Sequence, residues 1–388
     1  MQIAIEPITV PPSTAEMQLR LDKVRALMAR EGLDYYVAAQ GDNLYYLTNF
    51  ACMPQERPFF LVIPFDDTPV YIVPALEKES SRSNVMPEIE ICNYYDFPAP
   101  AGRTYIDALN NTIQSGKKVG IESSLSISRQ AVIPGRQTVV DIVDEARLIK
   151  SDYEIGRIAY ASLLANDGLA KTLEVSRPGT QQITVYTTSV QQMMGRVLTD
   201  IPDTNLLVTK FLSAVWPNEL SAMPHSHPGI FVTLEPGGPN VCIVTTQANG
   251  YSAELERTFF IGNIPEASKE PFDTAMEARA LAYELIKPGV AVADVDEAVQ
   301  GIIKKRGYGD YILHRTGHGF GITGHEPPWI ALGSDEVLEK NMVISIEPGI
   351  YIPGQGGYRH SDTVLITPDG CISLTSWPDK LEDLILPA

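Results

Sequence analysis

The 388-residue chain is poor in cysteine and in basic residues, and each shortage excludes a class of protein. Its four cysteines are far apart and form no CxxC pair, which argues against a disulfide framework and a thiolate zinc site. The 30 Lys and Arg residues against 48 Asp and Glu residues give a net charge of -18, which repels phosphate backbones and anionic lipid. We therefore expect neither nucleic acid nor a membrane as a partner.

Long apolar runs are also missing. No run approaches the roughly 18 residues of a membrane-spanning helix, and the N-terminal segment lacks the basic and apolar regions of a signal peptide. These absences predict a cytoplasmic protein. The length and the hydrophobic content of 44% favour two packed domains or so.

Hydrophobic periodicity predicts a mixed α/β (α+β) protein. The boundary is expected near residue 150, with an N-terminal α/β domain over 1–150 and a C-terminal domain over 151–388 that has a curved antiparallel sheet backed by helices. The supporting segments are helices over 15–31 and 141–175, two short strands around a turn in 59–73, and β-rich runs in 229–262 and 342–375.

All six histidines follow residue 224, which places the candidate site in the C-terminal half. Four short segments hold nearly all the groups suited to chemistry. They are MPHSHPG with His225 and His227, YSAELERTFF with Glu254 and Glu256, LHRTGHGFGITGHEPPWI with His314, His318 and His325, and SIEPGIYIPGQGGYRHSD with Glu347, Arg359, His360 and Asp362.

Each segment also has a simpler interpretation. The histidines of MPHSHPG could be a solvated loop pair, and the two alternating glutamates could lie on an edge strand facing water. Arg359 and Asp362 could form a structural ion pair. Four glycines between 317 and 324 argue against a helix that clamps a metal between His314 and His318, and they favour a substrate approaching the backbone. A buried Glu347 would have to face a cation, a histidine or a ligand.

Together the four segments resemble the creatinase, prolidase and aminopeptidase P superfamily, in order, spacing and content. The resemblance runs from about residue 15 to the C-terminus, and RLIKSDYEI is similar to the interdomain signature of that superfamily. It implies a "pita-bread" catalytic domain after a creatinase-type N-terminal domain, and it implies a homodimer.

The metallopeptidases of that superfamily hold two metal ions with five ligands. Carried onto this chain, three ligands are Glu254, His318 and Glu347, whereas the other two positions are occupied by Ile243 and Ser361. Two buried divalent ions need several anionic oxygens, so this resemblance predicts no dinuclear site and no required cofactor. The alternative is one divalent ion such as Mn or Zn on Glu254, His318 and Glu347, helped by His360.

The departures are similar to the metal-free creatinase pattern. We therefore expect a metal-independent hydrolase of an amide-like or amidino C–N bond in a small nitrogen-rich molecule, with His225 as general base and acid. Creatine itself fits poorly, because the position of a carboxylate-binding arginine is Trp329. The resemblance implies a catalytic set of His225, His318, Glu256 and Glu347, and a substrate-binding set of His227, Glu254, His325, His360 and Arg57, the last supplied by a partner subunit.

Two other functions stay open at this point. One is an Xaa-Pro dipeptidase or aminopeptidase P-type metallopeptidase with an altered metal site, since His318, His325 and Glu347 match that pattern equally well. The other is a catalytically silent pita-bread domain that binds peptides or partners.

Overall fold

The computed structural model describes residues 5–226 and 229–388, and the chain divides into two compact units. One unit is Val10–Arg147, and the other is Leu148–Ala388 together with the N-terminal residues up to Thr9. Each unit is described by itself. No helix within the described residues is long and apolar enough to cross a membrane.

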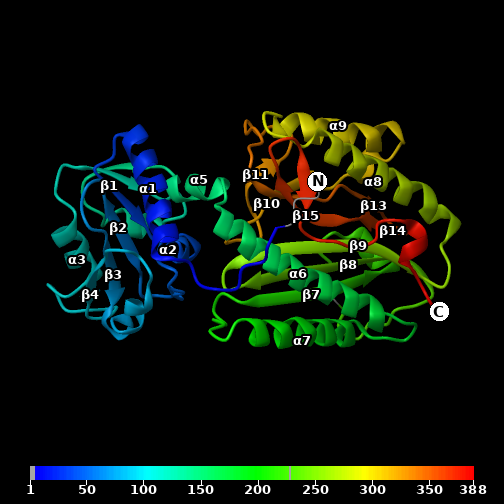
Figure 1. Cartoon of the computed structure of the whole chain (residues 1–388), viewed down its shortest axis with the longest axis horizontal. Coiled ribbons are helices and arrows are strands. Elements are labelled where there is room, and N and C mark those ends of the chain that lie inside the picture. The colour runs from blue at the N-terminus through cyan, green and yellow to red at the C-terminus, as the bar shows by residue number, and fades with distance from the viewer. Residues whose placement is uncertain (1–4, 227–228) are drawn as a thin grey trace. The chain divides into compact units, whose positions relative to one another are not determined.

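The smaller unit is built on a six-stranded sheet of order β4-β3-β2-β1-β5-β6 (Figure 1). The two strands expected in 59–73 are present as β2 and β3, which pair antiparallel. The elements are α1 (Thr14–Glu31), β1 (Tyr35–Ala38), α2 (Gly41–Thr48), β2 (Phe60–Pro64), β3 (Val70–Pro74), β4 (Glu90–Tyr94), α3 (Tyr105–Thr112), β5 (Lys118–Ile121), α4 (Ile127–Gln130), β6 (Arg136–Val139) and α5 (Ile142–Leu148), with 3-10 turns at Ala75–Glu77 and Ser80–Ser83.

Helix α1 shows why the local sequence folds as expected. The Ser13 side chain accepts a hydrogen bond from the backbone N–H of Glu16 at 3.1 Å, which caps the first turn. Gly32 ends the helix at φ 61°, a left-handed conformation that glycine adopts without a Cβ penalty. The apolar residues between these caps recur every three or four positions and are buried.

The single long helix expected over 141–175 is two helices, α5 and α6 (Asp152–Val175). Ser151 interrupts them with an extended backbone. Its side chain accepts from the Glu154 N–H at 3.2 Å, and the Glu154 carboxylate accepts from the Ser151 N–H at 3.0 Å. This reciprocal capping box starts a new helix where hydrophobic spacing alone predicts continuity.

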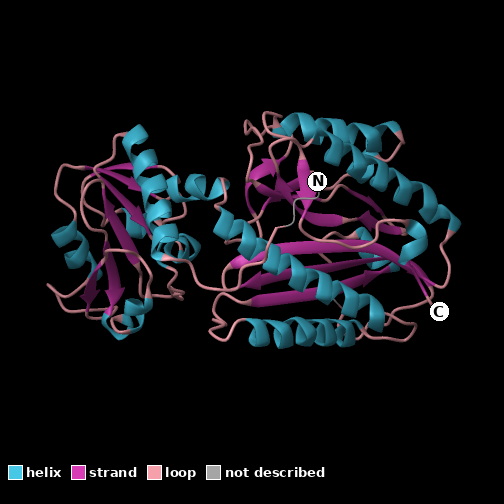
Figure 2. Ribbon diagram, in the orientation of Figure 1, coloured by secondary structure: helices cyan, strands magenta, loops and turns pink. Residues whose placement is uncertain are grey.

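The larger unit contains a curved, mainly antiparallel sheet of order β11-β10-β12-β15-β9-β8-β7, backed by helices, as the sequence predicts (Figures 1 and 2). Helix α6 packs on β8 and β9, and α7 packs on β7. The elements after α6 are α7 (Gln182–Asp200), β7 (Lys210–Pro217), β8 (Gly237–Ala248), β9 (Tyr251–Ile261), α8 (Glu266–Leu285), α9 (Val292–Lys305), β10 (Gly317–Gly319), β11 (Glu326–Ile330), β12 (Val343–Ile346), β13 (Gly349–Ile352), β14 (Gly356–Arg359), β15 (Ser361–Ile366), β16 (Cys371–Ser373) and β17 (Ile385–Leu386), with 3-10 turns at Asn218–Ala222, Gly309–Tyr311 and Leu381–Leu384.

Strand β9 is central to this sheet, because it pairs with β8 on one side and with β15 on the other. Every residue of the strand is buried. The interpretation of Glu254 and Glu256 as residues of a water-facing edge strand is therefore wrong. Two carboxylates inside a central strand need partners, and these partners define the site.

Candidate active site

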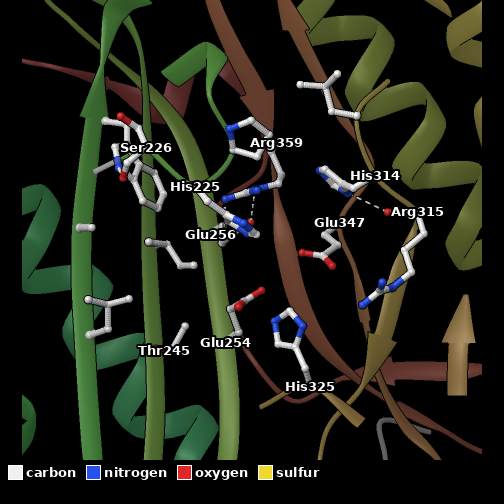
Figure 3. Close-up of a pocket in the computed structure, with 16 residues that line it drawn as sticks. His225, Ser226, Thr245, Glu254, Glu256, His314, Arg315, His325, Glu347 and Arg359 are labelled. Carbon is white, nitrogen blue, oxygen red and sulfur yellow. Dashed lines mark hydrogen bonds and ion pairs between the residues drawn. The ribbon is translucent and has the colours of Figure 1, made fainter. Parts of the chain in front are cut away.

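A cavity of about 810 Å³ lies within the larger unit. Alternate residues of β7, β8 and β9 face it, as the two-residue period of a strand requires. Glutamates and histidines meet on one side, and apolar side chains form another (Figure 3). The lining residues are Leu212, Ala214, Trp216, Pro224, His225, Ser226, Ile243, Thr245, Glu254, Glu256, Leu313, His314, Arg315, His325, Glu347 and Arg359.

Glu256 is held by a buried ion pair with Arg359. The Arg359 Nε lies 2.5 Å from Glu256 Oε2, and its Nη2 donates to Oε1 at 2.6 Å (Figure 3). Burial raises the pKa of Glu256 well above its usual range, although Arg359 opposes the shift. The ion pair expected between Arg359 and Asp362 is not formed, since Asp362 pairs instead with Arg257 and Arg279.

Glu254 lies two residues away on the same face of β9. The Ser361 hydroxyl donates to Glu254 Oε1 at 2.9 Å, so the residue at an expected ligand position supports this carboxylate. Burial and the nearby Glu347 carboxylate raise the pKa of Glu254. His318, Arg359 and the Ser361 hydroxyl only partly oppose this shift.

Glu347 follows β12 directly and meets His318. Its Oε1 lies 3.2 Å from His318 Nε2 and accepts from the Ser345 hydroxyl at 3.3 Å. The same hydroxyl accepts from the backbone N–H of His318 at 2.9 Å, so one serine fixes both residues. Burial works to raise the pKa of Glu347, but His318, His314 and Arg359 together hold it below its usual value. The sequence argument that a buried Glu347 must face a histidine or a cation is confirmed.

His318 and His325 stack with ring centroids 3.8 Å apart and an angle of 18° between their planes. His318 is on strand β10, which confirms that this glycine-rich segment is not a helix. Gly317 and Gly319 allow neighbouring strands to pack closely. The prediction that the glycines let a substrate approach the backbone is not supported at these two positions. A Cβ at Gly317 would lie 2.2 Å from the Ser345 carbonyl oxygen, and one at Gly319 would lie 2.2 Å from that of Pro327.

A second buried ion pair fixes the loop that carries His325. Lys150 Nζ lies 3.0 Å from Glu326 Oε1, and both side chains are buried. Glu326 Oε2 accepts from the Thr323 hydroxyl at 3.0 Å, which closes the turn before β11. The interdomain signature RLIKS therefore contributes, through Lys150, to the position of His325.

His314, Tyr351 and Arg359 form a chain of hydrogen bonds beside Glu347. The His314 Nε2 lies 2.7 Å from the Tyr351 hydroxyl, and Arg359 Nη1 donates to that hydroxyl at 3.0 Å. Tyr351 and Arg359 are buried and His314 is partly buried, so the phenol oxygen is a hydrogen-bond partner for a guanidinium that has little access to water.

We expect Tyr351→Phe to lower the free energy of unfolding by about 1–3 kcal/mol, because it removes a hydrogen-bond partner of the buried Arg359 and of the partly buried His314. Equilibrium unfolding in urea measures the change. Exposed Tyr186→Phe, on α7, is the matched control and should have no comparable effect. An unchanged midpoint for Tyr351→Phe would show that His314 and Arg359 find other partners.

Three residues expected at the site lie elsewhere or outside the description. His360 lies between β14 and β15, is fully buried, packs edge-on against Phe272 with centroids 5.4 Å apart, and is not among the residues that line the cavity. His227 lies outside the described residues. Arg57 belongs to the smaller unit, where its Nε donates to Asp96 at 2.6 Å and a terminal nitrogen pairs with Glu56. His225 is exposed and does line the cavity.

The sequence argument did not include Arg315 in the site, and it treated Arg359 as structural only. Arg315 lies with its guanidinium 4.5 Å above the Trp329 ring, and both Arg315 and Arg359 line the cavity. The sequence offered one clue to the role of Arg315. Trp329 occupies the position at which the resemblance to creatinases places a carboxylate-binding arginine. An aromatic ring at that position can support an arginine from the segment before β10.

The donor set fits one divalent cation. Ligand atoms of Glu254, His318 and His325 lie within 4.8 Å of one another, and so do those of Glu254, Glu256 and Glu347. The carboxylates converge toward a common space (Figure 3). Arg359 pairs with only one of the three glutamates, Glu256, so a divalent ion would favour the ionised forms of Glu254 and Glu347 in this buried space. A second ion would need the carboxylates that Ile243 and Ser361 replace.

Two family models match nearly the whole chain. Metallopeptidase family M24 matches residues 156–368, which is more than half of the chain, and the Creatinase/Prolidase N-terminal domain matches residues 20–149. A putative dipeptidase, YkvY of Bacillus subtilis, is 32% identical over 93% of this chain and 99% of its own length.

Named Xaa-Pro dipeptidases are also similar along their full length. That of Pyrococcus furiosus is 28% identical over 94% of this chain and 100% of its own length. Among solved structures, the Xaa-Pro dipeptidase from Bacillus anthracis superposes with a TM-score of 0.81 at 26% identity, over 95% of this chain and 100% of that chain.

These relatives correct the leading interpretation of the sequence. A creatinase-like, metal-independent hydrolase of an amidino bond and the absence of a cofactor are both wrong, because the matching family is a metallopeptidase family and the similar proteins are dipeptidases. A catalytically silent domain is likewise excluded by the match to hydrolases. The chain belongs to metallopeptidase family M24, within the creatinase, prolidase and aminopeptidase P pita-bread superfamily, and is a hydrolase of C–N bonds.

Proposed function

We propose that this protein is an Xaa-Pro dipeptidase-type metallopeptidase whose altered site holds a single divalent metal ion. The observation that carries the proposal is the close approach of ligand atoms, within 4.8 Å of one another, of Glu254, Glu256 and Glu347, of which only Glu256 pairs with Arg359. The relatives named Xaa-Pro dipeptidases support the substrate class.

The ion would be held by Glu254, His318 and Glu347. His318 Nε2 already lies 3.2 Å from Glu347 Oε1. A carboxylate oxygen of Glu254 lies within 4.8 Å of ring nitrogens of His318 and His325. Imidazole nitrogen with carboxylate oxygen is a donor set that Mn and Zn accept. His325, stacked on His318, is the fourth candidate donor.

Other residues of the cavity would bind the substrate and transfer a proton. When bound, a divalent ion supplies Lewis acidity toward the scissile carbonyl. His225 reaches the cavity from an exposed loop, where an imidazole can carry a proton to the leaving nitrogen. Leu212, Ala214 and Trp216 form an apolar wall that suits a hydrophobic side chain of the substrate.

The substrate is then a dipeptide, small enough for a cavity of about 810 Å³. A homodimer in which Arg57 of one subunit reaches the site of the other stays a prediction. Sedimentation equilibrium and an Arg57→Met variant test it together.

Metal removal tests the proposed function. After dialysis against a chelator, we expect hydrolysis of Xaa-Pro dipeptides to be lost, because three buried carboxylates cannot replace a Lewis acid. Titration with Mn²⁺ or Zn²⁺, with metal content measured in parallel, should restore it at one equivalent per chain. Full activity without metal, or a requirement for two equivalents, would contradict the single-ion site.

A further inference from the structure

Arg315 is a cationic residue of the cavity wall, and the two terminal nitrogens of its guanidinium make no hydrogen bond or ion pair with the described residues. Its Nε donates to the Gly317 carbonyl at 3.0 Å, but within residues 5–226 and 229–388 neither terminal nitrogen has a hydrogen-bond or ion-pair partner. The side chain is half-buried and lines the cavity beside His325 and Glu347 (Figure 3). Two free donors therefore face the substrate space.

The other cavity arginine cannot serve the same purpose. Arg359 directs its guanidinium to Glu256 and to the Tyr351 hydroxyl, and it is fully buried. Among the described lining residues, Arg315 is therefore the arginine that is open to an anionic group of a ligand, since the remaining charged side chains are carboxylates or histidines.

Trp329 holds the Arg315 guanidinium in a fixed plane. The guanidinium carbon lies 4.5 Å from the centre of the indole ring, and Nε is tied to the backbone. Both contacts leave the two terminal nitrogens as a rigid fork. A fork of this kind matches a carboxylate with two parallel hydrogen bonds, and little side-chain freedom is lost on binding.

We propose that Arg315, supported by Trp329, binds the free C-terminal carboxylate of the substrate and so limits cleavage to dipeptides. The proposal rests on the proposed function, because it assumes a peptide whose scissile carbonyl lies at Glu254, His318 and Glu347. A dipeptide has its carboxylate one residue beyond the scissile bond. A longer peptide would place a neutral amide against the fork and lose the charged pair.

The test compares a free dipeptide acid with its amide. In Arg315→Met, KM for Ala-Pro should rise about 10- to 100-fold, because a charge-assisted pair is lost. KM for Ala-Pro amide should not change, since the amide never forms that pair. Arg315→Lys should recover part of the loss for the acid, and Trp329→Leu should raise KM for the acid by a smaller factor.

Arg306→Met is the matched control, because Arg306 is half-exposed at the end of α9 and pairs with Glu277 away from the cavity. It should leave both KM values unchanged. Equal losses for the acid and the amide in Arg315→Met, or no loss for either, would overturn the proposal.

Calorimetric titration of the metal-loaded protein with proline separates the two proposals. If the wild-type protein turns over no Xaa-Pro dipeptide, the proposed function fails, but weaker proline binding in Arg315→Met than in Arg306→Met still supports the carboxylate site. If turnover is normal and the two variants bind proline alike, only the role of Arg315 fails.

Discussion

His318→Gln is expected to lower kcat/KM for Xaa-Pro dipeptides by a factor on the order of 100 or more. Substitution of residues that merely orient a metal ligand costs about 10- to 100-fold, and a direct ligand should cost at least as much. The change keeps a polar side chain of similar length, so the packing around β10 is disturbed less than by alanine. Metal content and steady-state rates measure the outcome.

His360→Leu is the control for His318→Gln. His360 is as deeply buried, but its ring lies against Phe272, and neither ring nitrogen has a hydrogen-bond partner among the described residues. An apolar side chain of similar volume should therefore be tolerated. Bound metal and near-normal activity in His318→Gln would show that another residue carries the site.

Arg359→Met is expected to lower the free energy of unfolding by about 3–5 kcal/mol, measured by urea denaturation. In the wild-type protein two guanidinium nitrogens of Arg359 lie 2.5 Å and 2.6 Å from the Glu256 carboxylate oxygens. The variant removes both nitrogens and leaves Glu256 buried in β9 without its cation. An unpaired carboxylate in a central strand must either carry an uncompensated charge or take up a proton, and both reduce stability.

The double variant Arg359→Met with Glu256→Gln isolates the ion pair. Removing both charges avoids the uncompensated carboxylate, so the double variant should be clearly more stable than Arg359→Met alone. If the two variants unfold alike, the loss comes from packing around the long arginine side chain. Metal content of the double variant also reports whether Glu256 contributes to the binding of the ion.

Much of the fold follows from the sequence because its signals are local. Helix α1 has its cap, its apolar stripe and its terminal glycine within the 20 residues from Ser13 to Gly32, and the strands β2 and β3 flank a turn of Asp, Thr and Pro. The helix over 141–175 was predicted as continuous because hydrophobic spacing does not register the break at Ser151. The capping box that causes it joins a serine and a glutamate three residues apart.

For the candidate site, the sequence predicted the chemical groups but not the way they pair. Residue types, their order and the family resemblance predicted Glu254, Glu256, His318, His325 and Glu347, whose ligand atoms the structure brings together. Both β9 glutamates line the cavity, as alternation along a strand predicts. The sequence also showed which ligand positions are lost, at Ile243 and Ser361. The prediction of a metal-independent site was wrong, and the match to a metallopeptidase family corrected it. Which charges are compensated depends on how many charges of each sign share one buried space.

Only the tertiary structure supplied that count. In the structure Arg359 pairs with Glu256, whereas Asp362 pairs with Arg257 and Arg279. The His360 side chain is buried in the core, and the Arg315 guanidinium lies over the Trp329 ring. These pairings join residues up to 105 positions apart. Coulomb attraction and desolvation depend on distance in space, so the sequence determined which chemical groups are present, whereas the packing of the sheet decided which charges are paired with one another.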